Sequence, residues 1–338
     1  MPIDRNSIDP LSDVLASIRL EGAIFLEAEL SAPWAMRGRY GLASARQRLA
    51  GAGHVILFHF FTEGTCKAQL AEGGETIEAS AGDLLLFPRD DRHILGSDLA
   101  YAPLEAETIR DWDEPHGVMS LRHGGGGAVT RYVCGYLACS RELVRPMLEA
   151  LPPLLLIPEG EGRSMELVRA LLAEAVRESA LGRPGSQSML ARLAEVVFVE
   201  ALRRHVESLP EGRQGWLAGL RDAHVGRALA RLHGEPARRW SVDALAREVA
   251  LSRSALAERF TAMVGESPMQ YLTRLRLCLA ARALRGGREA IARVALRSGY
   301  DSEAAFNRAF KREYGLPPAA WRKAALRPSG RTATPAAP

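Results

Sequence analysis

The chain has 338 residues, of which 47% are hydrophobic and 25% charged, and its formal net charge is +4 at pH 7. That length can bury two ordinary hydrophobic cores, which excludes a single small module. No apolar run approaches the roughly 20 residues of a membrane span, and the amino terminus lacks the basic start and apolar stretch of a signal peptide, so we expect a cytoplasmic protein without a membrane partner.

Charge is divided unevenly along the chain. Residues 216–338 carry 22 basic and 10 acidic side chains, a net charge of +12, whereas residues 1–215 have a net charge of −8. A basic segment joined to an acidic one suggests a polyanion partner for the basic segment, although arginine richness can also follow genomic base composition. The four cysteines are too few for a disulfide framework, and we expect reduced thiols.

Segments typical of strands fill the first 140 residues. They are short, apolar and separated by Gly, Pro and Asp at near-regular intervals, which predicts an all-β barrel or sandwich. These segments are 23–30, 54–61, 67–73, 75–88 and 130–139. The four glycines at 124–127 could cradle a phosphate, but no lysine of a phosphate-binding loop follows them, so we interpret them as a flexible turn.

From about residue 140 the apolar spacing becomes helical. Two helices are predicted within 164–179 and 187–206, with a stretch rich in Gly and Pro between them. The second helix, from Ser188 to His205, is apolar around more than half of its circumference. It can pack on the β domain, pair with a second subunit to form a homodimer, or do both.

The basic half contains one helical pattern twice. Each copy has a short apolar stretch, a tight turn, a serine and a second helix, which predicts helix-turn-helix motifs at about 241–263 and 291–313. In each second helix, two apolar side chains four residues apart mark the core face, and the opposite face is the one that DNA would meet. The residues predicted to contact DNA are Arg253, Ser254, Ala257, Glu258, Glu303, Ala304, Asn307, Arg308 and Lys311.

A predicted helix of about 18 residues separates the two copies. It is roughly 27 Å long, close to the roughly 34 Å of one turn of duplex DNA. Arg274 and Arg276 on this helix are candidates for phosphate contacts, whereas Cys278 is predicted to lie in the core. An all-helical domain without DNA binding is the alternative. Three histidines are predicted at the surface: His205, His224 and His233.

Four motifs occur in order in the basic half: Gly-x-Ser-Pro-x-x-Tyr at 265–271, Ser-Gly-Tyr at 298–300, Phe-x-Arg-x-Phe-Lys at 306–311 and Gly-x-x-Pro at 315–318. Together they resemble the tandem helix-turn-helix domain of the AraC/XylS family of bacterial transcription regulators. The resemblance implies that the two second helices enter successive major grooves on one face of the duplex, joined by the long central helix.

Residues 59–70 and 82–95 are similar to the two characteristic segments of a cupin barrel. With 122–137 and 192–204, they resemble the cupin-type sensor branch of the same regulator family, some of whose members respond to reactive chlorine or electrophiles. The resemblance puts His59 and His93 where metal-binding cupins place ligands. Phe61, however, stands where the second His of the usual His-x-His pair would fall.

A sensor site is one hypothesis for the β domain. His59, His93 and Cys134 lie on or beside predicted strands, so those that point inward could converge on one cavity. A thiolate and two imidazoles could bind zinc, with His123 as a fourth ligand. Cys134 could also be oxidised to a sulfenic acid or bonded to Cys139. The alternative is a core cysteine and two hydrogen-bonded histidines, with an effector bound by apolar contacts.

The sequence therefore predicts a multidomain α+β protein. A cupin-like β-barrel sensor domain is expected at 10–140, a helical linker and dimerisation segment at 141–210, an all-α tandem helix-turn-helix DNA-binding domain at 216–325, and a disordered tail at 326–338.

The predicted function is that of a sequence-specific, DNA-binding transcription regulator. It would act with RNA polymerase and respond to a small molecule or an oxidant, and whether it is an activator or a repressor stays open. The alternative is a metal-dependent cupin enzyme fused to a DNA-binding module. A self-repairing methyl-transfer regulator is disfavoured, because its Pro-Cys-His-Arg acceptor motif is absent from the sequence.

Overall fold

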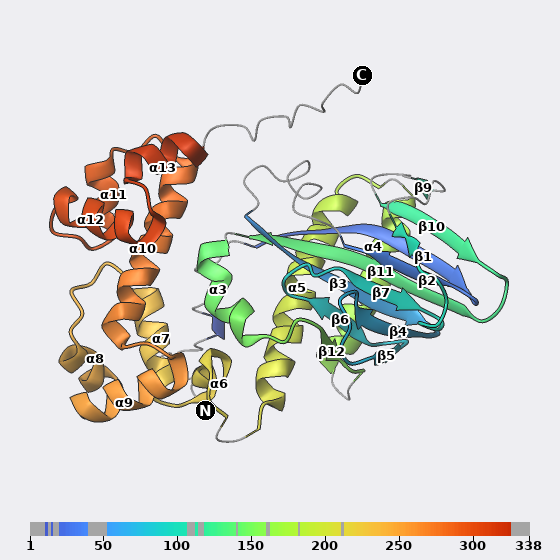
Figure 1. Cartoon of the computed structure of the whole chain (residues 1–338), viewed down its shortest axis with the longest axis horizontal. Coiled ribbons are helices and arrows are strands. Elements are labelled where there is room, and N and C mark those ends of the chain that lie inside the picture. Colours follow the sequence, from blue (N-terminus) through green and yellow to red (C-terminus); the bar gives the residue numbers. More distant parts are fainter. Residues whose placement is uncertain are drawn as a thin grey trace. The chain divides into compact units, whose positions relative to one another are not determined.

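The computed structural model describes residues 11–12, 15, 20–39, 53–106, 112–113, 118–139, 141–159, 163–181, 183–210 and 213–325. They divide into two compact units, one within Ile18–Arg213 and one within Met1–Ser17 and Gln214–Pro338 (Figure 1). The first contains two β-sheets and helices, and the second is helical. The predicted tail at 326–338 lies outside the described residues. None of the described helices is both long and apolar enough to cross a membrane.

The strands of the first unit form two mixed sheets. Most neighbouring strands pair antiparallel, but β1 pairs parallel with β10 and β2 pairs parallel with β8. The larger sheet has the order β12 (Leu155–Ile157), β6 (Leu84–Phe87), β3 (His54–Glu63), β11 (Val129–Cys139), β1 (Glu21–Ser31), β10 (Met119–Gly124) and β9 (Trp112–Asp113). The smaller sheet has the order β5 (Ile77–Ser80), β4 (Thr65–Leu70), β7 (His93–Gly96), β2 (Ala35–Gly38) and β8 (Leu104–Glu105).

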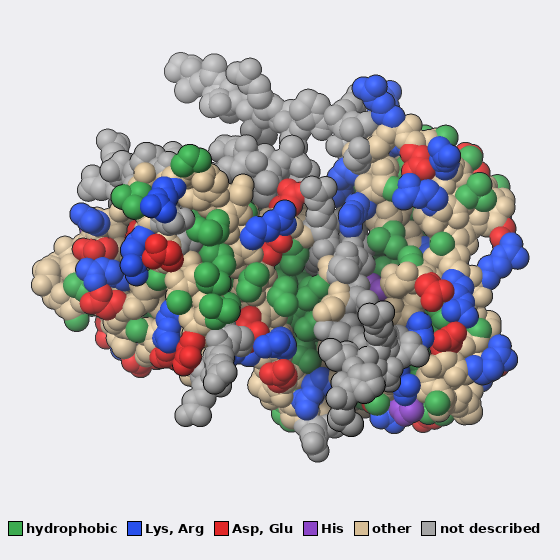
Figure 2. Space-filling model, turned by 180° about the vertical axis from the view of Figure 1, so that it is seen from behind, with side chains coloured by type: hydrophobic (Ala, Val, Ile, Leu, Met, Phe, Trp, Pro, Cys, Tyr) green, Lys and Arg blue, Asp and Glu red, His purple; other side chains and the backbone are tan. Residues whose placement is uncertain are grey.

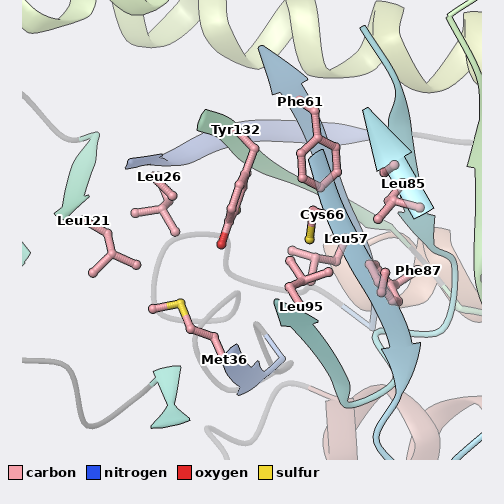
Figure 3. Packing of buried hydrophobic residues seen from close by; sticks show 14 of the residues in the cluster. Leu26, Met36, Leu57, Phe61, Cys66, Leu85, Phe87, Leu95, Leu121 and Tyr132 are labelled. Carbon is pink, nitrogen blue, oxygen red and sulfur yellow. The ribbon is translucent and has the colours of Figure 1, made fainter. Parts of the chain in front are cut away.

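One hydrophobic core lies between the two sheets (Figure 3). Phe61 and Tyr132 come from the larger sheet, and Met36, Cys66 and Leu95 come from the smaller one. Alternation of side chains along each strand turns every second residue toward this core. The prediction of an all-β sandwich or barrel holds as a sandwich, because pairing among the described strands does not close a barrel. The edge strands of both sheets are only two to four residues long, too short for a long closing ladder.

The glycine-rich turn between β10 and β11 is bound to the end of β1. The backbone N–H groups of Gly125 and Gly127 donate to the carbonyl oxygens of Ser31 and Ala32, and that of Gly126 donates to Ser31 Oγ. These N–H groups are therefore occupied by the chain itself. The turn acts as a strand connection, as predicted, and offers no phosphate cradle.

After β11 the first unit contains α3 (Arg141–Ala150), then β12, α4 (Arg163–Ala180) and α5 (Ser186–Ser208). α5 packs on β1 and against α4. A Cβ atom at Gly22 of β1 would lie 2.5 Å from the Ala191 carbonyl oxygen and 2.8 Å from Ala194 Cβ. The glycine thus lets the helix approach the strand backbone. This packing confirms the prediction that the second helix covers the β domain, with Leu193 and Phe198 buried.

The second unit repeats one short arrangement of helices. Its helices are α6 (Trp216–Arg221), α7 (Val225–Gly234), α8 (Val242–Glu248), α9 (Arg253–Val264), α10 (Pro268–Gly286), α11 (Ile291–Arg297), α12 (Glu303–Tyr314) and α13 (Pro318–Ala325). α9 and α12 have the same ends. Ser252 and Ser302 cap their N-termini, and Gly265 and Gly315 end them in the left-handed conformation, with φ of 84° and 74°.

α10 is shared between two hydrophobic cores. In its first half, the Tyr271 ring contacts Phe260 of α9 edge-on, with ring centroids 5.8 Å apart. In its second half, Leu277 and Leu284 pack with Phe306 and Phe310 of α12. Both halves of the helix are therefore buried, each against a different helix-turn-helix motif.

A buried polar triad fixes the first of these cores. The indole Nε1 of Trp216 donates to the Tyr271 hydroxyl over 3.2 Å, and that hydroxyl lies 2.7 Å from His233 Nε2. Because the hydroxyl proton must go to the imidazole, His233 accepts as a neutral ring. Burial, with a smaller effect of Arg274, lowers the pKa of His233 to about 4. The surface position predicted for His233 is thus wrong, since its partner lies 38 residues away in the sequence.

We expect His233 to make the unfolding free energy pH-dependent. Above about pH 6.5 the His233 ring is neutral in both the folded and the unfolded chain. Between about pH 6.5 and 4 the unfolded chain takes up a proton that the folded chain refuses, so stability falls as the pH falls and is then constant below about pH 4. By about pH 5.5 the loss is on the order of 1 kcal/mol.

The check is urea unfolding of the wild type and of His233→Gln, whose amide oxygen still accepts from Tyr271, at about pH 7.5 and about pH 5.5. The other histidines contribute equally to both proteins, so the loss should be smaller in the variant. Equal losses would contradict the assignment.

Candidate nucleic-acid interface and buried histidine–cysteine chain

The exposed face of α9 opposes its buried face. Leu256 and Phe260, four residues apart, have no exposed surface. The residues predicted to contact DNA lie on the other side: Arg253, Ser254 and Glu258 are exposed, and Ala257 is half-buried. Arg253 lies 3.6 Å from Asp243, but both side chains are more than half exposed, so this ion pair is weak. The Arg253 guanidinium is therefore available to an external partner.

α12 presents a matching face. Phe306 and Phe310 are buried in the core, as Leu256 and Phe260 are in α9. Of the residues predicted to contact DNA, Glu303, Ala304, Arg308 and Lys311 are exposed and Asn307 is half-buried. The two helices thus offer equivalent faces, and that of α12 is the more basic.

The two arginines predicted to bind phosphate from α10 are engaged within the protein. Arg274 Nε donates to Glu266 Oε1 over 3.0 Å, with its side chain only 22% exposed. Arg276 donates to the backbone carbonyl oxygens of Pro236 and Arg238, both over 2.7 Å. Neither guanidinium is therefore the free cation that the sequence suggests.

Sequence reasoning also missed an ion pair that positions α9. Arg259 Nε donates to Asp222 Oδ2 over 2.9 Å, and the carboxylate of Asp222 is almost fully buried. The other oxygen of Asp222 accepts from the backbone N–H groups of His224 and Val225 at the start of α7. The pair joins α9 to α7 across 37 residues of sequence, and no local spacing could have revealed it.

In the first unit, three of the predicted sensor residues form one buried chain. Cys134 of β11 lies opposite His59 of β3 in the strand register, and His93 begins β7 of the other sheet. His59 Nδ1 lies 2.8 Å from Cys134 Sγ, and His59 Nε2 lies 3.1 Å from His93 Nε2. No side chain of the three is more than 5% exposed. The prediction that they come together is thus met, deep in the core.

The direction of each hydrogen bond follows from the end of this chain. The Asp91 carbonyl oxygen can only accept, so His93 Nδ1 donates to it over 3.0 Å, and Nε2 of the neutral His93 ring must accept. His59 therefore donates from Nε2 and accepts at Nδ1. That leaves the Cys134 thiol as the donor, and one neutral state satisfies all three side chains.

Burial holds the chain in this neutral state. It lowers the pKa of His59 well below the usual value, with a smaller contribution from His93, and lowers the pKa of His93 to about 4. It also raises the pKa of the Cys134 thiol well above its usual range. Phe87 stacks on the His93 ring with centroids 3.8 Å apart, and Tyr132 meets the His59 ring edge-on. The thiol is therefore protonated, and aromatic rings pack against both imidazoles of the chain.

The zinc site suggested by the sequence does not fit this arrangement. Cys134 and His93 lie against opposite nitrogens of His59, so a metal ion bound to His59 could reach only one of them. His123 is exposed on β10. In the part of the chain that the structure describes, no group of three or more His, Cys, Asp or Glu side chains is arranged to hold a metal ion.

A disulfide between Cys134 and Cys139 does not fit either. Both residues belong to the extended strand β11, and five residues at about 3.3 Å each separate their Cα atoms by roughly 16 Å. A disulfide needs a Cα separation below about 7 Å. The odd spacing also points the two side chains to opposite faces of the sheet, so this bond would require the strand to unfold.

Known proteins match both units. Residues 9–207 match a Cupin family model, and residues 245–324 match a Helix-turn-helix domain model. An AraC-like transcription regulator from Streptomyces lividans is 34% identical over 94% of this chain and 98% of its own length. The HTH-type transcriptional regulator AlkR of Acinetobacter baylyi is 28% identical over 94% of this chain and 99% of its own. The RCS-specific HTH-type transcriptional activator RclR of Escherichia coli is 25% identical over 94% of this chain and 98% of its own length.

Proposed function

Because the chain belongs to the AraC-like family of DNA-binding transcription regulators with a cupin-like N-terminal domain, we propose that α9 and α12 read two successive major grooves of duplex DNA. The observation that carries this proposal is the pair of equivalent exposed faces at the two ends of α10. With 19 residues, α10 is about 28 Å long, comparable to the roughly 34 Å of one DNA turn.

Specific roles follow from the side chains on these faces. Arg253 and Arg308, both exposed, can each donate two hydrogen bonds to the edge of a guanine. Lys311 lies one turn after Asn307 and suits a phosphate oxygen. RNA polymerase is the protein partner that we propose for the DNA-bound form, because a regulator changes transcription by changing how polymerase binds or initiates.

We further propose that the cupin-like domain is a sensor and not an enzyme. Its relatives along nearly the full length are transcription regulators. Turnover by a metal-dependent cupin enzyme would need a bound metal ion, and the opposed positions of Cys134 and His93 around His59 argue against one. Sensing needs only a perturbation of the buried chain.

The effector class that we propose is a strong, small, neutral oxidant such as hypochlorous acid. The support is the Cys134 thiol, which hydrogen-bonds to His59 over 2.8 Å, together with the relative described as RCS-specific. In the reaction R–SH + HOCl → R–SOH + HCl, sulfur is oxidised, chlorine is reduced to chloride and a proton is released. The added oxygen atom has no room between Sγ and Nδ1, so His59 or β11 must move. Hydrogen peroxide should act less well, because it needs a thiolate.

A route from Cys134 to the helices is present within the first unit. Cys134 pairs in register with Leu26 of β1, and Gly22 on the same strand contacts the α5 backbone. A shift of β11 would therefore be transmitted through β1 to α5.

The outer faces of α4 and α5 support a homodimer. Hydrophobic side chains are visible between charged ones on the face of the molecule shown in Figure 2. Among the side chains that the structure describes on these two helices, the exposed large apolar ones are Leu167, Leu171, Met189, Val196 and Val199, with exposures of 36% to 59%. Leu193, on the same helix, is only 7% exposed and belongs to the core.

In vitro selection from random duplexes, followed by footprinting, tests the DNA proposal. We expect two protected blocks about 10 base pairs apart on one face of the duplex. Arg308→Ala should relax base preference in one block, with a loss of about 1–3 kcal/mol of discrimination. Lys323→Ala, which removes an exposed charge from α13, serves as the control and should leave the preference unchanged. A single protected block, or an unaltered base profile for Arg308→Ala, would contradict the proposal.

Operator binding before and after mild hypochlorite treatment tests the sensor. The wild type should change its affinity, and Cys134→Ser should not, because serine still donates a hydrogen bond to His59 but cannot form a sulfenic acid. Cys278→Ser in the second unit is the matched control and should respond as the wild type does. An identical response in the wild type and Cys134→Ser would reject Cys134 as the sensor.

Sedimentation velocity tests the dimer. Val196→Glu should convert a dimer to a folded monomer, because a charge then replaces apolar surface at the interface. Arg192→Glu, an exposed change one turn earlier on α5, should leave the dimer intact. If Val196→Glu sediments as the wild type does, α5 is not in the interface.

A further inference from the structure

Arg276 joins three elements of the second unit. It lies in the middle of α10, and its Nε and Nη2 atoms donate to the carbonyl oxygens of Pro236 and Arg238, in the segment that leads into α8. Both hydrogen bonds are 2.7 Å long. The planar guanidinium can hold two carbonyl groups at once, which a lysine cannot do in this fixed geometry. The long helix is thus fastened to the first helix-turn-helix motif by a side chain as well as by its hydrophobic face.

The second motif contacts the same guanidinium. Gly299, in the turn between α11 and α12, has a φ of 78°. A Cβ atom at Gly299 would lie only 2.8 Å from Arg276 Cζ and 3.0 Å from the Ala237 carbonyl oxygen. The turn therefore needs glycine both for its backbone conformation and for its approach to Arg276 and the first motif.

An outer ion pair spans the same junction. Arg239, just before α8, donates to Asp301, just before α12, over 2.5 Å. Both side chains are more than three-quarters exposed, so this pair contributes little by itself. Arg239 follows Arg238, whose carbonyl oxygen binds Arg276, and Asp301 lies two residues after Gly299. The ion pair therefore joins the same two segments as Arg276 does. The two motifs are thus connected directly as well as through α10.

We propose that Arg276 is a positioning residue that fixes the separation and rotation of α9 relative to α12, and thereby the one spacing between the two half-sites that the protein accepts. The hydrophobic cores at the two ends of α10 involve different residues, so a bend or twist of the helix between them would re-aim one reading helix without opening either core. The junction of Arg276, residues 236–239 and Gly299 opposes that motion. This inference rests on the proposed reading of DNA by α9 and α12.

The consequence is a sharp dependence on half-site spacing. One added base pair moves the second half-site by about 3.4 Å and rotates it by roughly 34° around the duplex. A rigid pair of helices cannot follow both changes and loses base contacts at one half-site. With the junction loosened, the helices can follow at least part of the change, and the penalty for altered spacing shrinks.

The test uses the full-length protein and the operator obtained by selection, in a series of duplexes with the half-sites moved by −2 to +2 base pairs. The wild type should lose about tenfold in affinity for each one-base-pair change. Arg276→Met and Arg276→Lys should flatten this profile to about threefold or less. Arg239→Met should flatten it slightly. Arg227→Met is the control, because Arg227 donates to the carbonyl oxygen of Ala223, only four residues away, and should keep the wild-type profile.

The spacing profile separates positioning from mere stability. A uniform loss of affinity at all spacings, with the wild-type profile retained in every Arg276 variant, would overturn the inference. If Arg276→Met fails to fold by circular dichroism, Arg276→Lys and Arg239→Met carry the test. Failure of the wild type to select any sequence would instead reject the proposed function.

Discussion

The second unit depends on the double burial of α10. Tyr271 in its first half and Leu284 in its second half lie in the cores of different helix-turn-helix motifs. Burial of apolar surface stabilises by about 25 cal/mol per Å², so displacing the helix would expose both cores together. The polar contacts of α10 then do what apolar contacts cannot. Hydrophobic packing is not directional, whereas the hydrogen bonds from Arg276 to two carbonyl groups oppose rotation of α10 relative to the segment before α8.

A second constraint recurs in both units: a neutral imidazole accepts a hydrogen bond inside a core. His93 belongs to the chain that begins at Cys134, and His233 belongs to the one that begins at Trp216. A buried polar group left without a partner costs about 1–3 kcal/mol, so each chain stabilises the fold only while every member is in place. This makes a buried polar chain sensitive to one added atom or proton, which a purely apolar core would not detect.

The sequence predicted the fold class because its signals are local. Helical periodicity, Ser at helix starts and Gly at helix ends specify α9 and α12 without knowledge of anything distant, and short, nearly continuous apolar runs indicate β3 and β11. Whether the sheets form a sandwich or close into a barrel depends on which strands pair at the sheet edges. That pairing involves residues far apart in the sequence, so local signals do not predict it. The donor and acceptor roles in the hydrogen bonds of His59 could not be predicted, since they depend on the strand register and on the Asp91 carbonyl oxygen. The inward roles of Arg276 and His233 likewise rest on partners 38 to 40 residues away.

The charge of the second unit shows how composition can mislead about position. A net charge of +12 suggests a uniformly basic surface, yet Asp222 and Glu266 form ion pairs with Arg259 and Arg274 within the second unit. These arginines shape the scaffold, and their charges are largely neutralised nearby. Arg308, Lys311 and Arg312 are exposed together on α12. In the proposed reading of DNA, these three exposed cations on α12 are the ones placed to attract phosphate, whereas the paired arginines are not.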